Sequence, residues 1–403
     1  MSPNPNHLPQ ALGAAIALLI LAQTADATPR ARSWRSLGMG NAGVAIADDG
    51  EALHLNPAGL TQLGGKGTFQ PLDTLGYKRN RVDCWILGLG MDPNPRTLLK
   101  AYRFYDRNDS TISAGEKDQK ALLKDRQFLN EIYQFDRLPI PLRTNLDLML
   151  AFRNYGVALW SQDDFTFQFD RGALTPKVAV ELSSTTALEL ATSRAFLDDR
   201  LSLGFGYRIL SISRQTREYD IMELSSDSAL EENGRDLYEE SSSDLRKSEE
   251  WGHGIDLGVL WFQKPGLRYG ASLQNLGMKQ HGQFLTPNLS VGVAWSPRFI
   301  QSNRAWSRKL NFAIGLDNLL DDTLGYKPLS KLNMGAEYEM TFIPYVFAGR
   351  LSGGLMGGYP TFGTSVTLLS ILRGDLLTYA EEGGHFTGDK ENRYWMARVG
   401  IGF

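Results

Sequence analysis

Apolar and polar residues alternate in short runs from residue 143 to the end of the chain. An alternation with period two places the two sets on opposite faces of β-strands. Three clear examples are Leu146, Leu148, Leu150 and Phe152 against Asn145, Asp147, Met149 and Ala151; Leu201, Leu203, Phe205, Tyr207 and Ile209 against Ser202, Gly204, Gly206 and Arg208; and Trp395, Ala397, Val399, Ile401 and Phe403 against Tyr394, Met396, Arg398, Gly400 and Gly402. The pattern predicts an all-β chain.

The polar face of these strands is rich in glycine and in charges of both signs, as expected for the packed, wet lumen of a membrane barrel. Beyond residue 27 the chain has no apolar run long enough for a membrane-spanning helix. We therefore predict a transmembrane β-barrel over residues 66–403. A soluble β-sandwich also alternates, and alternation alone does not identify the face that meets lipid, so this alternative stays open.

The first 27 residues are predicted to be a secretory signal peptide. An apolar run from Ala11 to Ala22 is followed by Ala25-Asp26-Ala27, an A-x-A cleavage site. The run is too short to span a bilayer as a helix, and no Lys or Arg precedes it. With a barrel behind it, this leader predicts the bacterial outer membrane as the destination.

Two long segments break the strand pattern. In 93–142, a capping box at Ser113 and Glu116 precedes a helical stripe of apolar residues. This segment is a second plug element, a periplasmic helix or an extracellular lid, and we favour an insertion that helps to close the lumen. Residues 220–250 are acidic and serine-rich, which predicts an extracellular loop. Divalent-cation bridging to lipopolysaccharide is a second interpretation of that loop.

Residues 28–65 are dominated by small side chains, which let backbone approach backbone closely. A short helix capped by Asp48 or Asp49 is expected to run to Leu55, where Asn56-Pro57 ends it. Such a compact segment suits a confined space, and we predict that it is a plug inside the barrel. Gly38 to Gly43 also match the dinucleotide fingerprint G-x-G-x-x-G, but the required preceding strand is replaced by a leader and a basic linker.

The order Leu-Gly-Met-Gly-x-Ala-Gly-Val-Ala, then Ala-Asp-Asp, then Asn-Pro-Ala-Gly-Leu, at positions 37–60, resembles the N-terminus of the FadL-like outer-membrane transport superfamily (long-chain fatty-acid transporters), which includes a PorV-like branch. The stretch 331–361 resembles the same superfamily. The resemblance implies a barrel of about fourteen antiparallel strands with an N-terminal helical plug in the lumen. It also implies passive uptake of a hydrophobic molecule, fatty-acid-like or aromatic, with lateral exit through the wall. The residues expected to form the gating plug are Asn56, Pro57, Ala58, Gly59, Gly38, Gly40 and Gly43.

Charged residues on the lumen face of the strands are expected to pair and to hold the strands and plug together, while a minority line a solute path. The residues concerned are Asp147, Arg208, Asp256, Glu337, Arg350 and Arg398. At the C-terminus, Phe403, Ile401 and Val399 resemble the signal that the outer-membrane barrel assembly machinery reads.

No motif for chemistry stands out. The four histidines after the leader form no paired metal motif, and no serine carries a local catalytic signature. We therefore expect no enzyme activity, no metal and no cofactor. The net charge of -3 gives no footprint for nucleic acid. Cys84 is the single cysteine, so an internal disulfide is excluded.

Two functions remain. The first is a channel for hydrophobic small molecules, gated by the plug. The alternative is a PorV-like barrel that docks secreted or envelope proteins without transport. The expected partners are outer-membrane lipid and lipopolysaccharide, the assembly machinery, a hydrophobic ligand and, in the alternative, an envelope protein. A wide apolar tunnel favours the first function, and an occluded, charged lumen favours the second or a structural role.

Overall fold

A computed structural model describes residues 33–63, 81–91, 139–170, 177–220, 250–280, 283–297, 308–320, 328–343, 346–369, 371–382 and 391–402. Within these ranges fourteen antiparallel strands form a closed barrel, because β1 pairs with both β2 and β16. The strands are β1 (Arg81–Met91), β2 (Pro139–Phe152), β3 (Tyr155–Asp170), β4 (Lys177–Phe196), β5 (Leu201–Asp220), β6 (Glu250–Lys264), β7 (Leu267–Leu276), β10 (Asn288–Trp295), β11 (Arg308–Leu316), β12 (Leu332–Ile343), β13 (Phe347–Met356), β14 (Tyr359–Leu368), β15 (Leu372–Glu382) and β16 (Glu391–Gly402).

Closure pairs the first strand with the last and leaves no edge, as a sheet in a bilayer requires. The predicted all-β transmembrane barrel is confirmed. A short separate hairpin, β8 (Lys279–Gln280) with β9 (Gln283–Phe284), lies between β7 and β10. No helix in the described part of the chain is long and apolar enough to cross a membrane.

The outer surface of the barrel is apolar, and it carries the residues that alternation placed on one face. Leu148, Phe205 and Leu257 are exposed, whereas their polar neighbours point inward. On β6, Trp251 is 59% exposed and Trp261 is 49% exposed. They lie about 33 Å apart along the strand. With a strand tilt of about 40°, this gives an axial distance of about 25 Å, the height of the apolar band in outer-membrane barrels.

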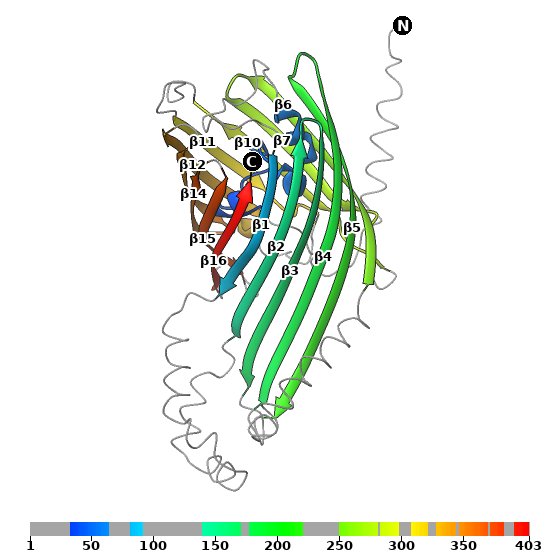
Figure 1. Ribbon diagram of the computed structural model, residues 1–403. Helices are drawn as coiled ribbons and strands as arrows, with labels where there is room; N and C mark the ends of the chain where they lie inside the picture. Colours follow the sequence, from blue (N-terminus) through cyan, green and yellow to red (C-terminus); the bar gives the residue numbers. More distant parts are fainter. Residues whose placement is uncertain are drawn as a thin grey trace.

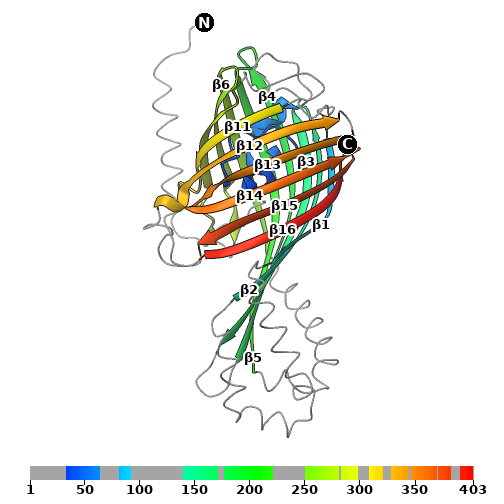
Figure 2. The same ribbon diagram turned by 90° about the vertical axis from the view of Figure 1, so that its left-hand side faces the viewer.

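The two ends of the barrel differ. One end of the barrel, which we call the short-turn end, has mostly short connections, such as 153–154, 197–200 and 265–266. The connection 296–307 at the same end is longer. The opposite, long-loop end has the connections 92–138 and 221–249. At this end β2 to β5 continue well beyond the other strands (Figures 1 and 2). β4 and β5 each have 20 residues, where about 9–11 cross a bilayer.

Residues 33–63, which we call the plug, lie inside the barrel (dark blue in Figures 1 and 2). They form α2 (Trp34–Gly38), α3 (Ala52–Leu55) and the 3-10 helix η2 (Pro57–Gln62). The Ser33 side chain caps α2 by accepting from Ser36 N. Asn56 is extended, which ends α3, and its side chain accepts from Ala58 N to begin η2 with Pro57 in the first turn.

Of the two candidate caps, Asp49 accepts from Glu51 N at 3.1 Å through Oδ1, in the turn before α3, whereas the Asp48 carboxylate binds cations. The N-cap of α3 itself is Glu51, without a side-chain cap. Two expectations about boundaries are wrong. Residues 139–142, assigned to the insertion, belong to β2 and pair with β3. Asp220 and Glu250, assigned to the acidic loop, end β5 and begin β6. The rest of both segments, the leader and Phe403 lie outside the described residues.

Inward-facing glycines of the wall seat the plug. A Cβ added at any of eight wall glycines would lie 3.0 Å or less from plug atoms, and at six of them it would lie that close to plug backbone. The glycines are Gly156 of β3, Gly204 of β5, Gly258 of β6, Gly270 of β7, Gly292 of β10, Gly335 of β12, Gly354 of β13 and Gly363 of β14. We call these eight residues the glycine seat. Any larger side chain there would push the plug off the wall.

Two adjacent positions of β13 test the seat. A Cβ at Gly354 would overlap backbone of Met39 and Gly40, whereas a Cβ at Gly353 would meet only Thr361 O at 3.7 Å. We expect Gly354→Ala to lower the free energy of unfolding by about 1–3 kcal/mol, as overpacking does. Gly353→Ala should change it by less than about 0.5 kcal/mol. Denaturant unfolding of the detergent-solubilised barrel measures both, and equal effects would contradict the seat.

Candidate functional site

A cluster of eight charged residues joins the plug to the wall, and we call it the eight-charge cluster. The plug supplies Arg35, Asp48 and Asp49; the wall supplies Arg268, Lys309, Glu337, Glu339 and Arg350. Arg35 is its centre, with Nη2 2.6 Å from Glu337 Oε1 and Nε 2.7 Å from Glu337 Oε2, a bidentate pair. Its four cations balance its four carboxylates, so the cluster is neutral while buried.

Asp48 brings three cations together. Its carboxylate is 2.5 Å from Arg35 Nη1, 3.1 Å from Lys309 Nζ and 3.3 Å from Arg268 Nη1. Burial alone would raise the pKa of Asp48, but the three cations outweigh burial and hold that pKa well below its usual range. Asp48 is therefore ionised at any physiological pH and fixes its loop to β7 and β11.

Glu51 forms a second anchor, to β16 and β15. Its carboxylate accepts from Arg398 and from the Ser33 hydroxyl, and Arg35 N donates to it at 3.1 Å. Arg398 also donates to Asp375 at 2.7 Å and lies over the Trp34 ring. Burial works to raise the pKa of Glu51, and Arg398 and Ser33 outweigh burial and lower it. This anchor holds the start of α2 and the start of α3 against one wall.

His54 forms the third anchor. Its Nδ1 lies 2.9 Å from Glu189 of β4 and its Nε2 lies 3.2 Å from Asp147 of β2. Burial alone would lower the pKa of His54, but the two carboxylates outweigh burial and raise it to about 10. The imidazole is therefore charged and donates from both nitrogens. Behind it, Arg208 joins Glu189 and Asp256, each at 2.9 Å.

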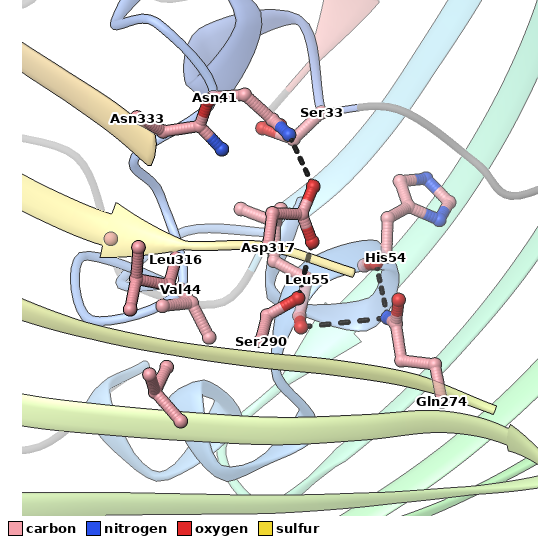
Figure 3. A pocket seen from close by; sticks show the side chains of 12 residues that line it. Ser33, Asn41, Val44, His54, Leu55, Gln274, Ser290, Leu316, Asp317 and Asn333 are labelled. Atoms are coloured by element: carbon pink, nitrogen blue, oxygen red, sulfur yellow. Dashed lines mark hydrogen bonds between the residues drawn. The ribbon is translucent and has the colours of Figure 1, made fainter. Parts of the chain in front are cut away.

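A small pocket remains between the plug and the wall (Figure 3). Asn41 and Val44 line it from the plug, and Ser290, Gly315 and Asp317 line it from β10, β11 and the residue that follows β11. Asp317 lies between Asn41 and Ser290 and accepts from both, at 2.8 Å and 2.5 Å (Figure 3). The free volume is about 20 Å³, which is room for about one water molecule.

Two apolar clusters lie on the inner side of the wall. One joins Trp34 and Leu37 of the plug to Leu377, Tyr379, Tyr394 and Met396 of β15 and β16. The other joins Trp160, Ala187, Leu210 and Ile212 of β3 to β5 to Met278 and Leu285 beside the β8–β9 hairpin. The inner wall thus carries both charged anchors and apolar clusters.

The structure brings together most of the residues that the sequence singled out. All six expected lumen charges, Asp147, Arg208, Asp256, Glu337, Arg350 and Arg398, lie on the inner face and take part in the anchors. Asn56, Pro57 and Ala58 lie against β5 and β6, where Asn56 Nδ2 donates to Val259 O at 3.1 Å, while Gly59 packs on Ala47 within the plug. Gly38 and Gly40 lie against β13 and β14, while Gly43 packs on Ser36 within the plug.

The sequence pattern assigns no partner to the plug's own charges, Arg35, Asp48, Asp49 and His54, of which it predicts only that Asp48 or Asp49 caps a helix. A signal was present, because charges of both signs in a segment destined for an enclosed lumen require partners of opposite sign. In the described residues no group of three or more His, Cys, Asp and Glu side chains is arranged to hold a metal ion.

No protein-family model and no curated protein sequence matches the chain. Solved structures do match. The toluene transporter TodX of Pseudomonas putida is 10% identical with a TM-score of 0.43, covering 91% of this chain and 96% of TodX. LpxR from Salmonella typhimurium is 9% identical with a TM-score of 0.28, covering 78% and 99%. Both structures have low sequence identity and low TM-scores to this chain. The strand pairing of the chain itself gives the fourteen-stranded barrel that the FadL-like resemblance implies.

The His54 anchor predicts a pH dependence. Because the pKa of His54 is raised to about 10 from 6.5, its contribution to stability is complete below about pH 6.5, falls as the pH rises and disappears above about pH 10. His54→Gln removes the cation shared by Asp147 and Glu189 and leaves Glu189 with Arg208 alone, which should cost about 3–5 kcal/mol below pH 6.5.

Denaturant unfolding at a series of pH values measures this cost. The difference between the native chain and His54→Gln should shrink between pH 7 and pH 10. His253→Gln is the control, since His253 lies on the outer face, where its Nδ1 bonds Tyr207 at 2.8 Å. A cost that stays constant with pH would contradict a charged His54.

Proposed function

We propose that this chain is an outer-membrane channel for small hydrophobic molecules, closed by the plug and opened when part of the plug moves. With the plug in place the lumen is occluded and lined by paired charges, which taken alone favours docking or a structural role, so the channel requires part of the plug to move. The observation that carries the proposal is that the plug is a separate segment of the same chain, held by side-chain ion pairs and hydrogen bonds, some of which, such as Asn41 with Asp317, are single hydrogen bonds. The short-turn end faces the periplasm and the long-loop end faces the exterior, following the rule for outer-membrane barrels.

The proposed cargo follows from the apolar clusters and the resemblance. Trp34 with Tyr379 and Tyr394, and Trp160 with Leu210 on the other side, form buried apolar clusters inside the barrel. Separation of these side chains would give a hydrophobic molecule apolar surface within the lumen. The FadL-like motif at 37–60 supports the same class of cargo, fatty-acid-like or aromatic.

Disulfides between plug and wall test the proposal. Thr61 Oγ1 lies 2.8 Å from Ser202 Oγ, and Asn41 Nδ2 lies 2.8 Å from Asp317 Oδ2. Replacing all four by cysteine, with Cys84→Ala, would fasten the plug to β5 and to the residue after β11. Cells that carry the oxidised variant should take up radiolabelled palmitate or ethylbenzene no faster than cells that lack the protein. A reductant should restore the faster uptake.

The reduced form of the same variant is the control, because it carries the same substitutions. If the native chain raises the entry of neither compound, the proposed transport function is wrong. If entry is the same in the oxidised and reduced forms, the proposed gating by the plug is wrong.

Docking of a secreted or envelope protein is a second candidate, favoured by the length of β2 to β5. β4 and β5 pair without interruption from Lys177 with Asp220 to Phe196 with Leu201, far longer than a bilayer requires. The excess lies at the exterior end and offers a rigid surface. The test purifies the native chain and the Lys177→Glu/Glu218→Lys variant from detergent extracts. A stoichiometric protein partner that is lost from the variant would support docking. Extracts without any such partner would oppose it.

A further inference from the structure

We propose that the plug opens locally, by displacement of residues 41–43 and rotation of the Val44 side chain at the end of the β10–β11 pairing, while the Val44 backbone stays against Gly270 and η2 stays in the glycine seat. The inference rests on the proposed channel function and deepens it, because it names the part that moves and the place where the solute passes. Three independent observations converge on this sector of the wall.

The first observation is that η2 is fixed on one side. A Cβ at Gly204 or Gly258 would overlap the backbone of Ala58, so wall and plug backbone are in contact there. Asn154 N donates to Leu60 O at 3.2 Å, and Asn56 Nδ2 donates to Val259 O. Backbone contact at two glycines, a backbone hydrogen bond at Leu60 and the Asn56 amide hold η2 together, so rotation of one side chain cannot release it. Movement of η2 would need rupture of several contacts at once.

The second observation is that small apolar side chains, without ion pairs, make the contact of Ala42 and Val44 with β10 and β11, where Ala42 packs with Ala294 and Ala313. A Cβ at Gly292 would meet the Val44 side chain, which can rotate, and a Cβ at Gly315 would lie 3.9 Å from Ala42 Cα. The β10–β11 pairing covers five residue pairs, the shortest ladder among the described strands of the barrel. It ends at Val291 and Leu316, beyond which Leu319 N donates to Leu289 O.

The third observation is the pocket, which lies where that ladder ends (Figure 3). Asn41 has a φ of 62°, a left-handed conformation that Asn and Gly tolerate, so the chain turns sharply there. Its side chain bridges to Asp317 across the pocket. Release of this bridge and rotation of Val44 would widen the pocket between two strands without disturbing the eight-charge cluster.

Thiol accessibility tests the inference without reference to transport. Ser290→Cys places a thiol in the pocket, and Thr61→Cys places one at the glycine seat, each with Cys84→Ala. Asn41→Gly removes the bridging amide and keeps the left-handed turn. We expect it to speed labelling of residue 290 by a small methanethiosulfonate several-fold and to leave residue 61 unchanged. Equal acceleration at both residues, or at neither, would overturn local opening.

Single disulfides then locate the movement that transport needs. Oxidised Asn41→Cys/Asp317→Cys should block entry of labelled ethylbenzene, and oxidised Thr61→Cys/Ser202→Cys should leave it at the level of the reduced form. The reverse pattern, or a block by both disulfides, would overturn local opening while the channel function stands. If neither compound enters through the native chain, the proposed function fails, and the labelling experiment still decides whether residues 41–43 move.

Discussion

A charged side chain inside a closed barrel must be paired with a neighbouring group of opposite charge, and this constraint determines how the plug and the wall fit together. In the eight-charge cluster the plug brings one cation and two carboxylates, and the wall brings three cations and two carboxylates. Neither part is neutral alone, and the two are neutral together. A buried charge without a partner costs several kcal/mol. The charges of the wall therefore determine which charges the plug must carry, and the charges of the plug determine those of the wall.

Shape adds a second condition that charge does not supply. Charged side chains reach their partners only if the plug backbone lies directly on the wall, and the glycine seat makes that distance possible at eight strands. Asn56 illustrates how the two conditions meet. Its side chain starts η2, donates to Val44 O within the plug and donates to Val259 O of β6. Local folding of the plug and its attachment to the barrel therefore depend on the same amide.

Much of the fold could be predicted from the sequence, because period-two alternation is a local property that each strand carries by itself. Trp395, Val399 and Ile401 point outward as the pattern requires, and Arg398 points inward. The partner of Arg398 could not be predicted, because Glu51 lies 347 positions away along the chain and spatial contact leaves no local trace. The cap assigned to Asp48 failed for the same reason, since a local rule competed with three distant cations. The glycines of the polar face were recognised as a group, but their role in seating a backbone appears only when the plug is placed.

The same physics limits how such a channel opens. Ejecting the whole plug would separate the eight-charge cluster, the Glu51 anchor and the His54 anchor together, and each broken buried pair costs about 3–5 kcal/mol until water replaces the partner. A hydrophobic solute that enters passively brings no comparable free energy. Breaking a hydrogen bond between Asn41 and Asp317 costs about 1.5–3 kcal/mol, because one partner is charged. Thermal motion supplies an opening of that size often, so the proposed channel would open at the Asn41–Asp317 sector and keep its charges paired throughout.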